Sequence, residues 1–128
     1  MKPINELGGA ELDVAVARAE GYSVERANVG EGWMVTRAGK AAKVLWIHDD
    51  LDESTFAPSR DWAWGGPIIH REKIAIVGSL YGDTWDAYVS GYVTYDGIES
   101  KPLHAYVMDA PTPLIAAMRA FVASKEPK

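Results

Sequence analysis

The chain has 128 residues and 48% of them are hydrophobic, so it is long enough to bury the core of one globular domain. Thirteen basic residues against eighteen acidic ones give a formal net charge of −5, which argues against unspecific binding to nucleic acid. The sequence contains no cysteine, which excludes disulfides, thiolate zinc sites and a cysteine nucleophile and suits a reducing compartment. No apolar run is long enough for a signal segment or a membrane span, so we expect a single cytoplasmic domain over residues 1–128.

Two amphipathic helices are predicted, one near each end of the chain. Apolar residues recur at helical spacing over residues 9–20, and Gly21 follows, where glycine most easily adopts the left-handed turn that ends a helix. Near the other end, Thr112 is placed to cap a helix, Pro113 suits its first position, and an apolar stripe continues to Val122. Both helices are expected to bury their apolar stripes.

Between these helices the sequence changes to short runs rich in β-branched and aromatic residues. The predicted strands span residues 32–37, 43–47, 74–77, 88–95 and 103–107. Residues 38–40 and 96–97 are typical of hairpin turns, and the second pair is the favoured Asp-Gly. The elements predict an α+β fold in which a mostly antiparallel sheet of about five strands carries the N- and C-terminal helices on one face.

Residues 48–71 form the one long stretch without clear periodicity, and such a connection in a compact domain is usually functional. In an extended segment Trp62 and Trp64 would face the same side and could form a platform for a planar ligand. Gly65 and Gly66 would let backbone amides approach that ligand closely. The alternative is that the tryptophans cover the core and the glycines only turn the chain.

Charged and capping groups extend this predicted site. Arg60 or Arg71 could bind an anionic group through a bidentate fork. The amides at the start of the last helix, near Thr112, form a second candidate anion site, although Thr112 could simply cap the helix. Trp85 could line the same pocket as residues 62–71, or pack in the core.

Acid-base chemistry is a separate hypothesis for the same segment. His70 and Glu72 are two residues apart and could flank a substrate, with Asp61 orienting the imidazole. The alternative is an ion-pair network of Asp61, His70, Arg71 and Glu72 that only fixes the segment. The acidic run at residues 48–53 matches no calcium loop and is interpreted as a solvated loop, so no metal site is predicted.

Three segments carry a family resemblance: LDVAVARAEG at residues 12–21, PSRDWAWGGPIIHRE at residues 58–72 and PTPLIAAMR at residues 111–119. In this order and spacing they resemble the NinX-like family of tailed phages and prophages. The resemblance implies a phage or prophage accessory protein in the cytoplasm of a bacterial host cell, and it supplies no reaction.

The leading functional hypothesis is a non-enzymatic protein that binds a small anionic, nucleotide-like ligand and thereby sequesters a host defence signalling molecule. One alternative is a module that binds a host protein, and another is an acid-base hydrolase that uses His70. Neither a cofactor nor a membrane contact is expected, and a homo-oligomer is left open. The expected ligand-binding residues are Arg60, Asp61, Trp62, Trp64, Gly65, Gly66, His70, Arg71, Glu72, Trp85 and Thr112.

Overall fold

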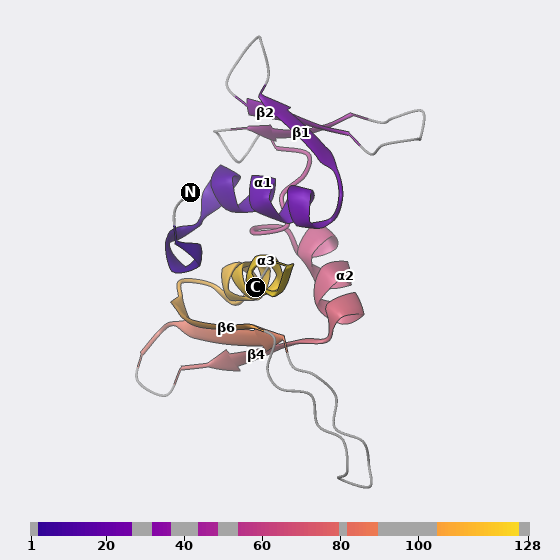
Figure 1. Ribbon diagram of the computed structural model, residues 1–128. Helices are drawn as coiled ribbons and strands as arrows, with labels where there is room; N and C mark the ends of the chain where they lie inside the picture. Colours follow the sequence, from indigo (N-terminus) through magenta and orange to yellow (C-terminus); the bar gives the residue numbers. More distant parts are fainter. Residues whose placement is uncertain are drawn as a thin grey trace, which may run out of the picture.

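The computed structural model describes residues 3–26, 32–36, 44–48, 54–79, 82–89 and 105–125. The helical elements are η1 (Ile4–Glu6), α1 (Gly9–Ala19), α2 (Trp62–Glu72) and α3 (Pro113–Lys125). The strands are β1 (Ser23–Arg26), β2 (Gly32–Thr36), β3 (Leu45–His48), β4 (Ile74–Gly78), β5 (Trp85–Val89) and β6 (Ala105–Ala110). The predicted α+β class is confirmed, and Figure 1 shows α1 and α3 lying between two sheets.

The described strands form two three-stranded antiparallel sheets, so the expectation of one sheet of about five strands is wrong. The strands β1, β2 and β3 pair in chain order in the first sheet, and β4, β5 and β6 do so in the second. The helix α2 separates the two groups along the chain and interrupts the succession of antiparallel neighbours. The sequence does not predict β1, because three of its four residues are exposed and Val24 is its single apolar residue.

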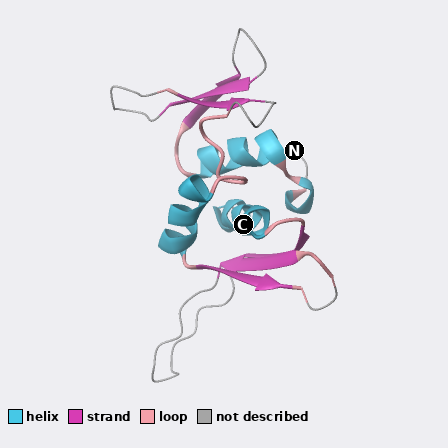
Figure 2. Ribbon diagram, turned by 180° about the vertical axis from the view of Figure 1, so that it is seen from behind, coloured by secondary structure: helices cyan, strands magenta, loops and turns pink. Residues whose placement is uncertain are grey.

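The terminal helices lie in different layers, and not together on one face of a sheet as expected. In Figures 1 and 2, α1 lies against the β1–β3 sheet, α3 lies on the β4–β6 sheet, and the two helices face each other. The helix α3 also contacts α2, so it is enclosed on several sides. Eight of its thirteen residues are buried, and a helix that is apolar nearly all round is stable only in the interior.

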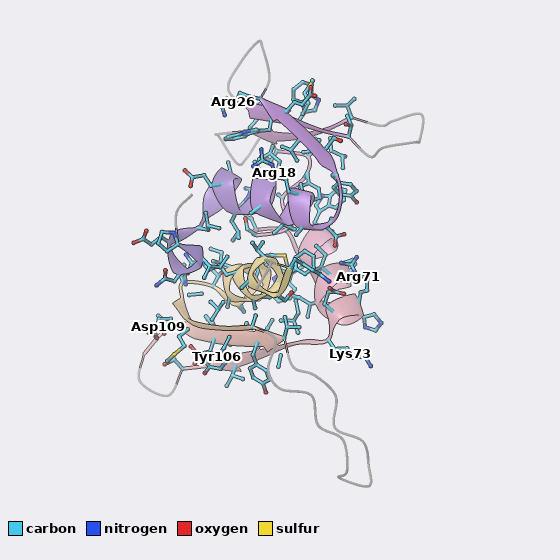
Figure 3. The ribbon with its side chains drawn as sticks, in the orientation of Figure 1. Arg18, Arg26, Arg71, Lys73, Tyr106 and Asp109 are labelled. Carbon is cyan, nitrogen blue, oxygen red and sulfur yellow. The ribbon has the colours of Figure 1, made fainter. Side chains whose placement is uncertain are left out.

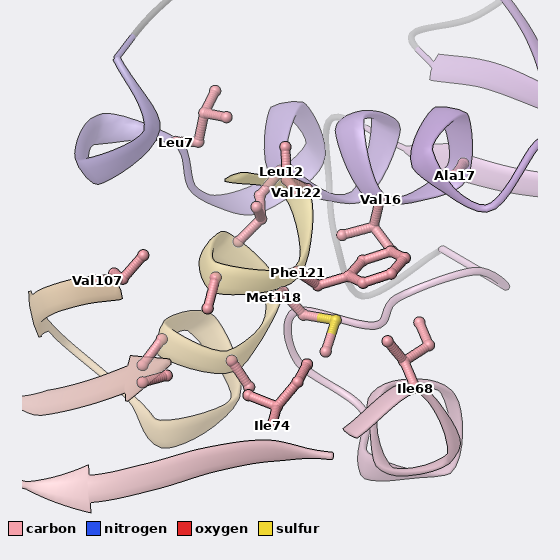
Figure 4. Packing of buried hydrophobic residues seen from close by; sticks show 14 of the residues in the cluster. Leu7, Leu12, Val16, Ala17, Ile68, Ile74, Val107, Met118, Phe121 and Val122 are labelled. Carbon is pink, nitrogen blue, oxygen red and sulfur yellow. The ribbon is translucent and has the colours of Figure 1, made fainter. Parts of the chain in front are cut away.

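The core lies where the three α-helices meet, and it confirms the predicted apolar stripes. Met118 and Phe121 of α3 are fully buried and lie close to Leu12 and Val16 of α1 and to Ile68 of α2 (Figure 4). Because these residues come from distant parts of the sequence, a single cluster joins both ends of the chain to its centre.

One arginine enters this core. Arg119 of α3 is buried, and its Nε donates a 2.7 Å hydrogen bond to the backbone carbonyl of Leu7. Burial lowers the pKa of Arg119 below the ordinary value of a guanidinium group. This bond holds the segment between η1 and α1 against α3.

The predicted ends of α1 and α3 are confirmed in atomic detail. Gly21 has a φ of 90°, and the amides of Gly21 and Tyr22 donate to the carbonyls of Arg18 and Ala17, each at 3.0 Å. This is the left-handed helix end for which glycine is the least strained residue. At the start of α3, the hydroxyl of Thr112 accepts a 3.1 Å hydrogen bond from the amide of Ile115.

The helix α2 occupies the segment in which the sequence shows no periodicity, and it includes Gly65, Gly66 and Pro67. These residue types normally interrupt a helix, so sequence patterns argue against one here. Asp61 caps it by accepting a 2.9 Å hydrogen bond from the amide of Ala63. Tertiary packing also stabilises α2, since Gly65 and Ile68 are buried.

Gly65 allows α2 to approach its neighbours, and alanine at this position should destabilise the protein. A Cβ atom there would lie 2.5 Å from Cδ1 of Leu114 and 2.6 Å from the carbonyl oxygen of Pro58, so the backbone would have to move. Gly65→Ala is expected to cost about 1–3 kcal/mol, as overpacking usually does. Gly66→Ala, whose Cβ meets no atom within 4 Å beyond its chain neighbours and its own helix backbone, should change stability by less than about 1 kcal/mol, because crowding against Pro67 opposes the gain from replacing a helical glycine. Urea unfolding checks both, and a Gly65→Ala variant as stable as Gly66→Ala would contradict this packing.

Some predictions fall outside the described residues. These are the turns at residues 38–40 and 96–97, most of the acidic run at 48–53, and the parts of the predicted strands that include residues 37, 43, 90–95 and 103–104.

Candidate functional site

A pocket of about 290 Å³ lies beside the start of α2. It is lined by Gly9, Ser59, Arg60, Trp62, Thr112, Pro113, Leu114 and Ile115. Small-molecule pockets are typically about 300–1,000 Å³, so this one is at the lower end of that range. It can hold one small ligand.

Three helices begin at this pocket. Gly9 is the first residue of α1, Trp62 is the first of α2, and residues 113–115 form the first turn of α3. Each helix N-terminus carries a partial positive charge and amides without an intrahelical partner. Each helix start therefore contributes a positive partial charge to the pocket, in addition to the charge of Arg60.

Side chains accept hydrogen bonds from some of the amides at these helix starts. Asp61 accepts one from the amide of Ala63, and Thr112 accepts one from the amide of Ile115. The amides of Trp62 and Leu114 have no hydrogen-bond partner among the described residues. No side chain caps α1 at Gly8. Free donors therefore remain at the starts of α2 and α3.

Two kinds of side chain complete the pocket. The indole of Trp62 is 53% exposed, which is unusual for so large an apolar group. Arg60 is exposed beside it, while Leu114 contributes an apolar side chain from α3. The arrangement offers a cationic group, a flat aromatic surface and an apolar wall within one small cavity.

A buried acid lies behind this pocket. Asp13 of α1 has 0% exposure, and its Oδ1 accepts a 2.8 Å hydrogen bond from the backbone amide of Ser59, which lines the pocket. Its Oδ2 has no hydrogen-bond partner among the described residues. Burial raises the pKa of Asp13 to about 6, against the opposing effects of its bonds with Ser59 and the charge of Arg60. The carboxyl group can therefore change protonation near neutral pH.

The structure brings three of the predicted site residues together in the pocket, namely Arg60, Trp62 and Thr112. Asp61 stands next to them as the cap of α2. The predicted platform of two indoles is wrong, because side chains two residues apart in a helix lie about 160° apart around its axis and so point to nearly opposite sides. Trp64 is half-buried and packs against Phe56, with ring centroids 5.0 Å apart.

The glycines also differ from the predicted role. Gly65 is buried, and its amide donates a 2.9 Å hydrogen bond to the carbonyl of Asp61, so this amide is not available to a ligand. Gly66 has open space around its Cβ position, although Gly66 is outside the lining of the pocket. Both are helical residues, and the turn they were expected to make does not exist.

Arg71 and Glu72 lie at the other end of α2, in an ion-pair network. Arg71 pairs with Glu20, the C-cap of α1, and its Nε lies 3.4 Å from Oε2 of Glu72. The Nζ of Lys125 lies 2.8 Å from Oε1 of the same Glu72. Hydrogen bonding to Glu20 raises the pKa of Arg71, and hydrogen bonding from Lys125 lowers that of Glu72. Figure 3 shows Arg71 where α2 meets the end of α1.

This network corrects two interpretations of the sequence. The predicted network of Asp61, His70, Arg71 and Glu72 is right only for the last two residues, and it extends to Glu20 and Lys125 instead. Asp61 cannot orient the imidazole of His70, because the two residues are nine positions apart along α2, a rise of about 13.5 Å. His70 itself is exposed.

Trp85 belongs to a different region. It lies in β5 and lines a second cavity together with Gly78, Ser79 and residues 82–84. The expectation that Trp85 shares a pocket with residues 62–71 is therefore wrong.

The family model described as "Bacteriophage P22, NinX" matches residues 4–125, which is nearly the whole chain. This chain belongs to the phage P22 NinX family. The resemblance carried by the three sequence segments is thus confirmed. A search of curated proteins finds no match.

The described part of this NinX-family chain holds no group of three or more His, Asp or Glu side chains placed to bind a metal ion. Its described helices are all too short or too polar to cross a membrane.

Sequence reasoning missed several residues at the pocket of this NinX-family protein. Gly9, Ser59 and Leu114 carry no chemical signature, and only the fold brings them together. Asp13 does leave a signal, because it is an acid between two apolar residues of a helix, Leu12 and Val14. All three are buried, so the carboxyl group had to enter the interior.

Proposed function

We propose that this NinX-family accessory protein binds a small anionic, nucleotide-like molecule in the pocket at the three helix N-termini and leaves it chemically unchanged. The observation that supports the proposal is the meeting of these N-termini beside Arg60 and the exposed indole of Trp62. The biological effect would be sequestration of a host signalling nucleotide.

Electrostatics favours an anion in this pocket. Each helix N-terminus acts as roughly half a positive charge, and phosphate groups bind readily to such ends through backbone amides. Arg60 adds a full charge and a planar fork that matches phosphate oxygens. Protonation of Asp13 below about pH 6 would remove the nearest buried negative charge and strengthen binding further.

Shape favours an anion attached to a flat ring. The indole of Trp62 can stack on a base, and Pro113, Leu114 and Ile115 give the cavity an apolar side. A volume of about 290 Å³ suits one nucleotide and is too small for a longer oligonucleotide.

The arrangement supports binding rather than hydrolysis. General acid-base catalysis needs a proton-transfer group within hydrogen-bond reach of the substrate. His70 is near the far end of α2 from the pocket, and Asp13 is buried behind Ser59. No described histidine lines the pocket.

The test is a binding titration with inorganic phosphate, 5′-mononucleotides and cyclic nucleotides, followed by tryptophan fluorescence and thermal shift. A bound nucleotide should raise the melting temperature by mass action. Arg60→Gln should weaken binding about tenfold to a hundredfold, since a hydrogen bond to a charged group contributes about 1.5–3 kcal/mol. Trp62→Leu should weaken the binding of nucleotides more than the binding of inorganic phosphate, because only the base of a nucleotide stacks on the indole.

Arg71→Gln is the matched control, because Arg71 is an arginine near the opposite end of α2 that does not line the pocket. It should leave nucleotide affinity unchanged. The proposal is overturned if no member of the panel binds, or if Arg71→Gln weakens binding as much as Arg60→Gln. Chromatography of the ligand after long incubation should recover it intact, and a product that disappears in His70→Gln would favour the hydrolase instead.

A further inference from the structure

The sheet of β4, β5 and β6 has one face covered by α3 and a second face, called the open face, that no described helix or strand covers. Its covered face packs on α3 through Ala87, Val107 and other buried residues. Because side chains alternate along a strand, Tyr88 and Tyr106, which are paired across β5 and β6, point to the opposite face. Figure 3 shows Tyr106 on the side of β6 away from α3.

The open face carries large apolar side chains that are accessible to solvent. Val77 is 47% exposed, Tyr106 50% and Met108 55%, and these are three of the five most notable exposed hydrophobic residues of the described chain. The rings of Tyr88 and Tyr106 are stacked, with centroids 6.1 Å apart and an interplanar angle of 13°. Exposed apolar side chains gathered on one sheet face are typical of an interaction site.

The charge of this face is negative. Asp86 is paired with Val77 across the strands, and Oδ2 of Asp86 accepts a 3.3 Å hydrogen bond from the hydroxyl of Tyr106. Oδ1 of Asp86 accepts a 3.1 Å hydrogen bond from the amide of Asp109, whose φ of 60° is uncommon for a residue other than glycine. The strands β4, β5 and β6 contain no lysine or arginine among their described residues.

We propose that this face, defined by Val77, Asp86, Tyr88, Tyr106 and Met108, binds a short extended protein segment. Every second residue of this segment faces the sheet, and the facing residues are an arginine or lysine between two apolar residues. Cations of such a segment would lie over the tyrosine rings and beside Asp86, and its apolar side chains would cover Val77 and Met108. The acidic groups repel phosphates, so the aromatic face is unsuited to single-stranded nucleic acid.

The size of the face sets the length of its partner. Three strands spaced by about 5 Å and five residues long give an area about 10 Å wide and 17 Å long. A stable interface between folded proteins buries about 800 Å² on each side, which is several times more. An extended segment of five or six residues fits, and the expected affinity is micromolar or weaker.

The test uses two synthetic peptides and amide chemical shifts of the whole protein. The first is acetyl-Leu-Ser-Arg-Ser-Leu-amide, in which the leucines and the arginine lie on one side of an extended backbone, and the control is acetyl-Leu-Ser-Glu-Ser-Leu-amide. Only the arginine peptide should shift the amides of β5 and β6, and its affinity should fall as salt is added. Val77→Ser and Met108→Ser should each weaken it at least threefold, whereas Val44→Ser, which removes a 41% exposed valine outside this sheet, should not.

Several outcomes would overturn the inference. Equal binding of both peptides would mean that charge plays no part, and shifts elsewhere would mean that another surface is used. The inference would also be overturned if neither peptide bound, or if single-stranded oligothymidine bound more tightly than the arginine peptide. So would shifts of the β5 and β6 amides on raising the protein concentration alone, since these would assign the face to a second copy of the chain.

Discussion

Replacing Met118 with aspartate is expected to unfold most of the protein at 25 °C. Met118 is fully buried at the centre of the cluster that joins α1, α2 and α3. Loss of a buried methionine side chain costs about 2–5 kcal/mol, and an unpaired polar group in the same place adds about 1–3 kcal/mol or more. The sum approaches the whole stability of a typical domain, about 5–15 kcal/mol.

Two control substitutions test whether the loss of stability comes from placing a polar group in the core. Met118→Leu keeps the volume and apolar character and should cost less than about 1.5 kcal/mol. Met108→Asp makes the same chemical change at a side chain that is 55% exposed, and it should change stability by about 0.5 kcal/mol at most. Thermal and urea unfolding give the comparison, and an unaltered melting curve for Met118→Asp would refute the core described here.

The second large effect is a dependence of stability on pH that comes from Asp13. Its pKa is about 6 in the folded protein, against 3.8 as the ordinary value, so the folded state binds the proton more tightly than the unfolded chain does. The stability from this proton is fully present below about pH 4 and is lost as pH rises through about 6. Two pKa units correspond to about 3 kcal/mol.

Asp13→Asn isolates this contribution, because asparagine is neutral at each pH and can still accept from the amide of Ser59. Between pH 4 and 7 the wild type should lose about 2–2.5 kcal/mol of stability relative to this variant, while other titrating groups cancel in the difference. Urea unfolding at each pH measures the difference, and titration of the Asp13 carboxyl carbon by NMR gives its pKa directly. Parallel stability curves, or a carboxyl that titrates near pH 4, would show that the folded protein does not resist ionisation of Asp13.

The candidate site could be predicted from the sequence only in part. Arg60 and Trp62 stand out in the sequence because a cation and a large aromatic lie close together in a long segment without periodicity, and Thr112 because it precedes a predicted helix. The supposed partnership of Trp62 with Trp64 depended on an extended backbone, and a helix turns the two indoles apart. The contribution of α1 could not be foreseen, since Gly9 and Arg60 are 51 positions apart in the chain.

The sequence by itself determined the features that depend on neighbours along the chain. Periodic apolar residues specified α1 and α3. Gly21 ends α1 because glycine adopts a positive φ without strain, and Thr112 begins α3 because its hydroxyl accepts a hydrogen bond from the first turn. Three ordered segments also determined the NinX family, which the match over residues 4–125 confirms.

Only the tertiary structure decided the features that depend on distant contacts. The helix α2 contains Gly65, Gly66 and Pro67, which disfavour helices locally, and it is stabilised by its cap and by packing against α3. The division into two sheets follows from this helix, because it separates β3 from β4. The pocket exists because packing brings three helix starts together, and no local pattern encodes the distance between them.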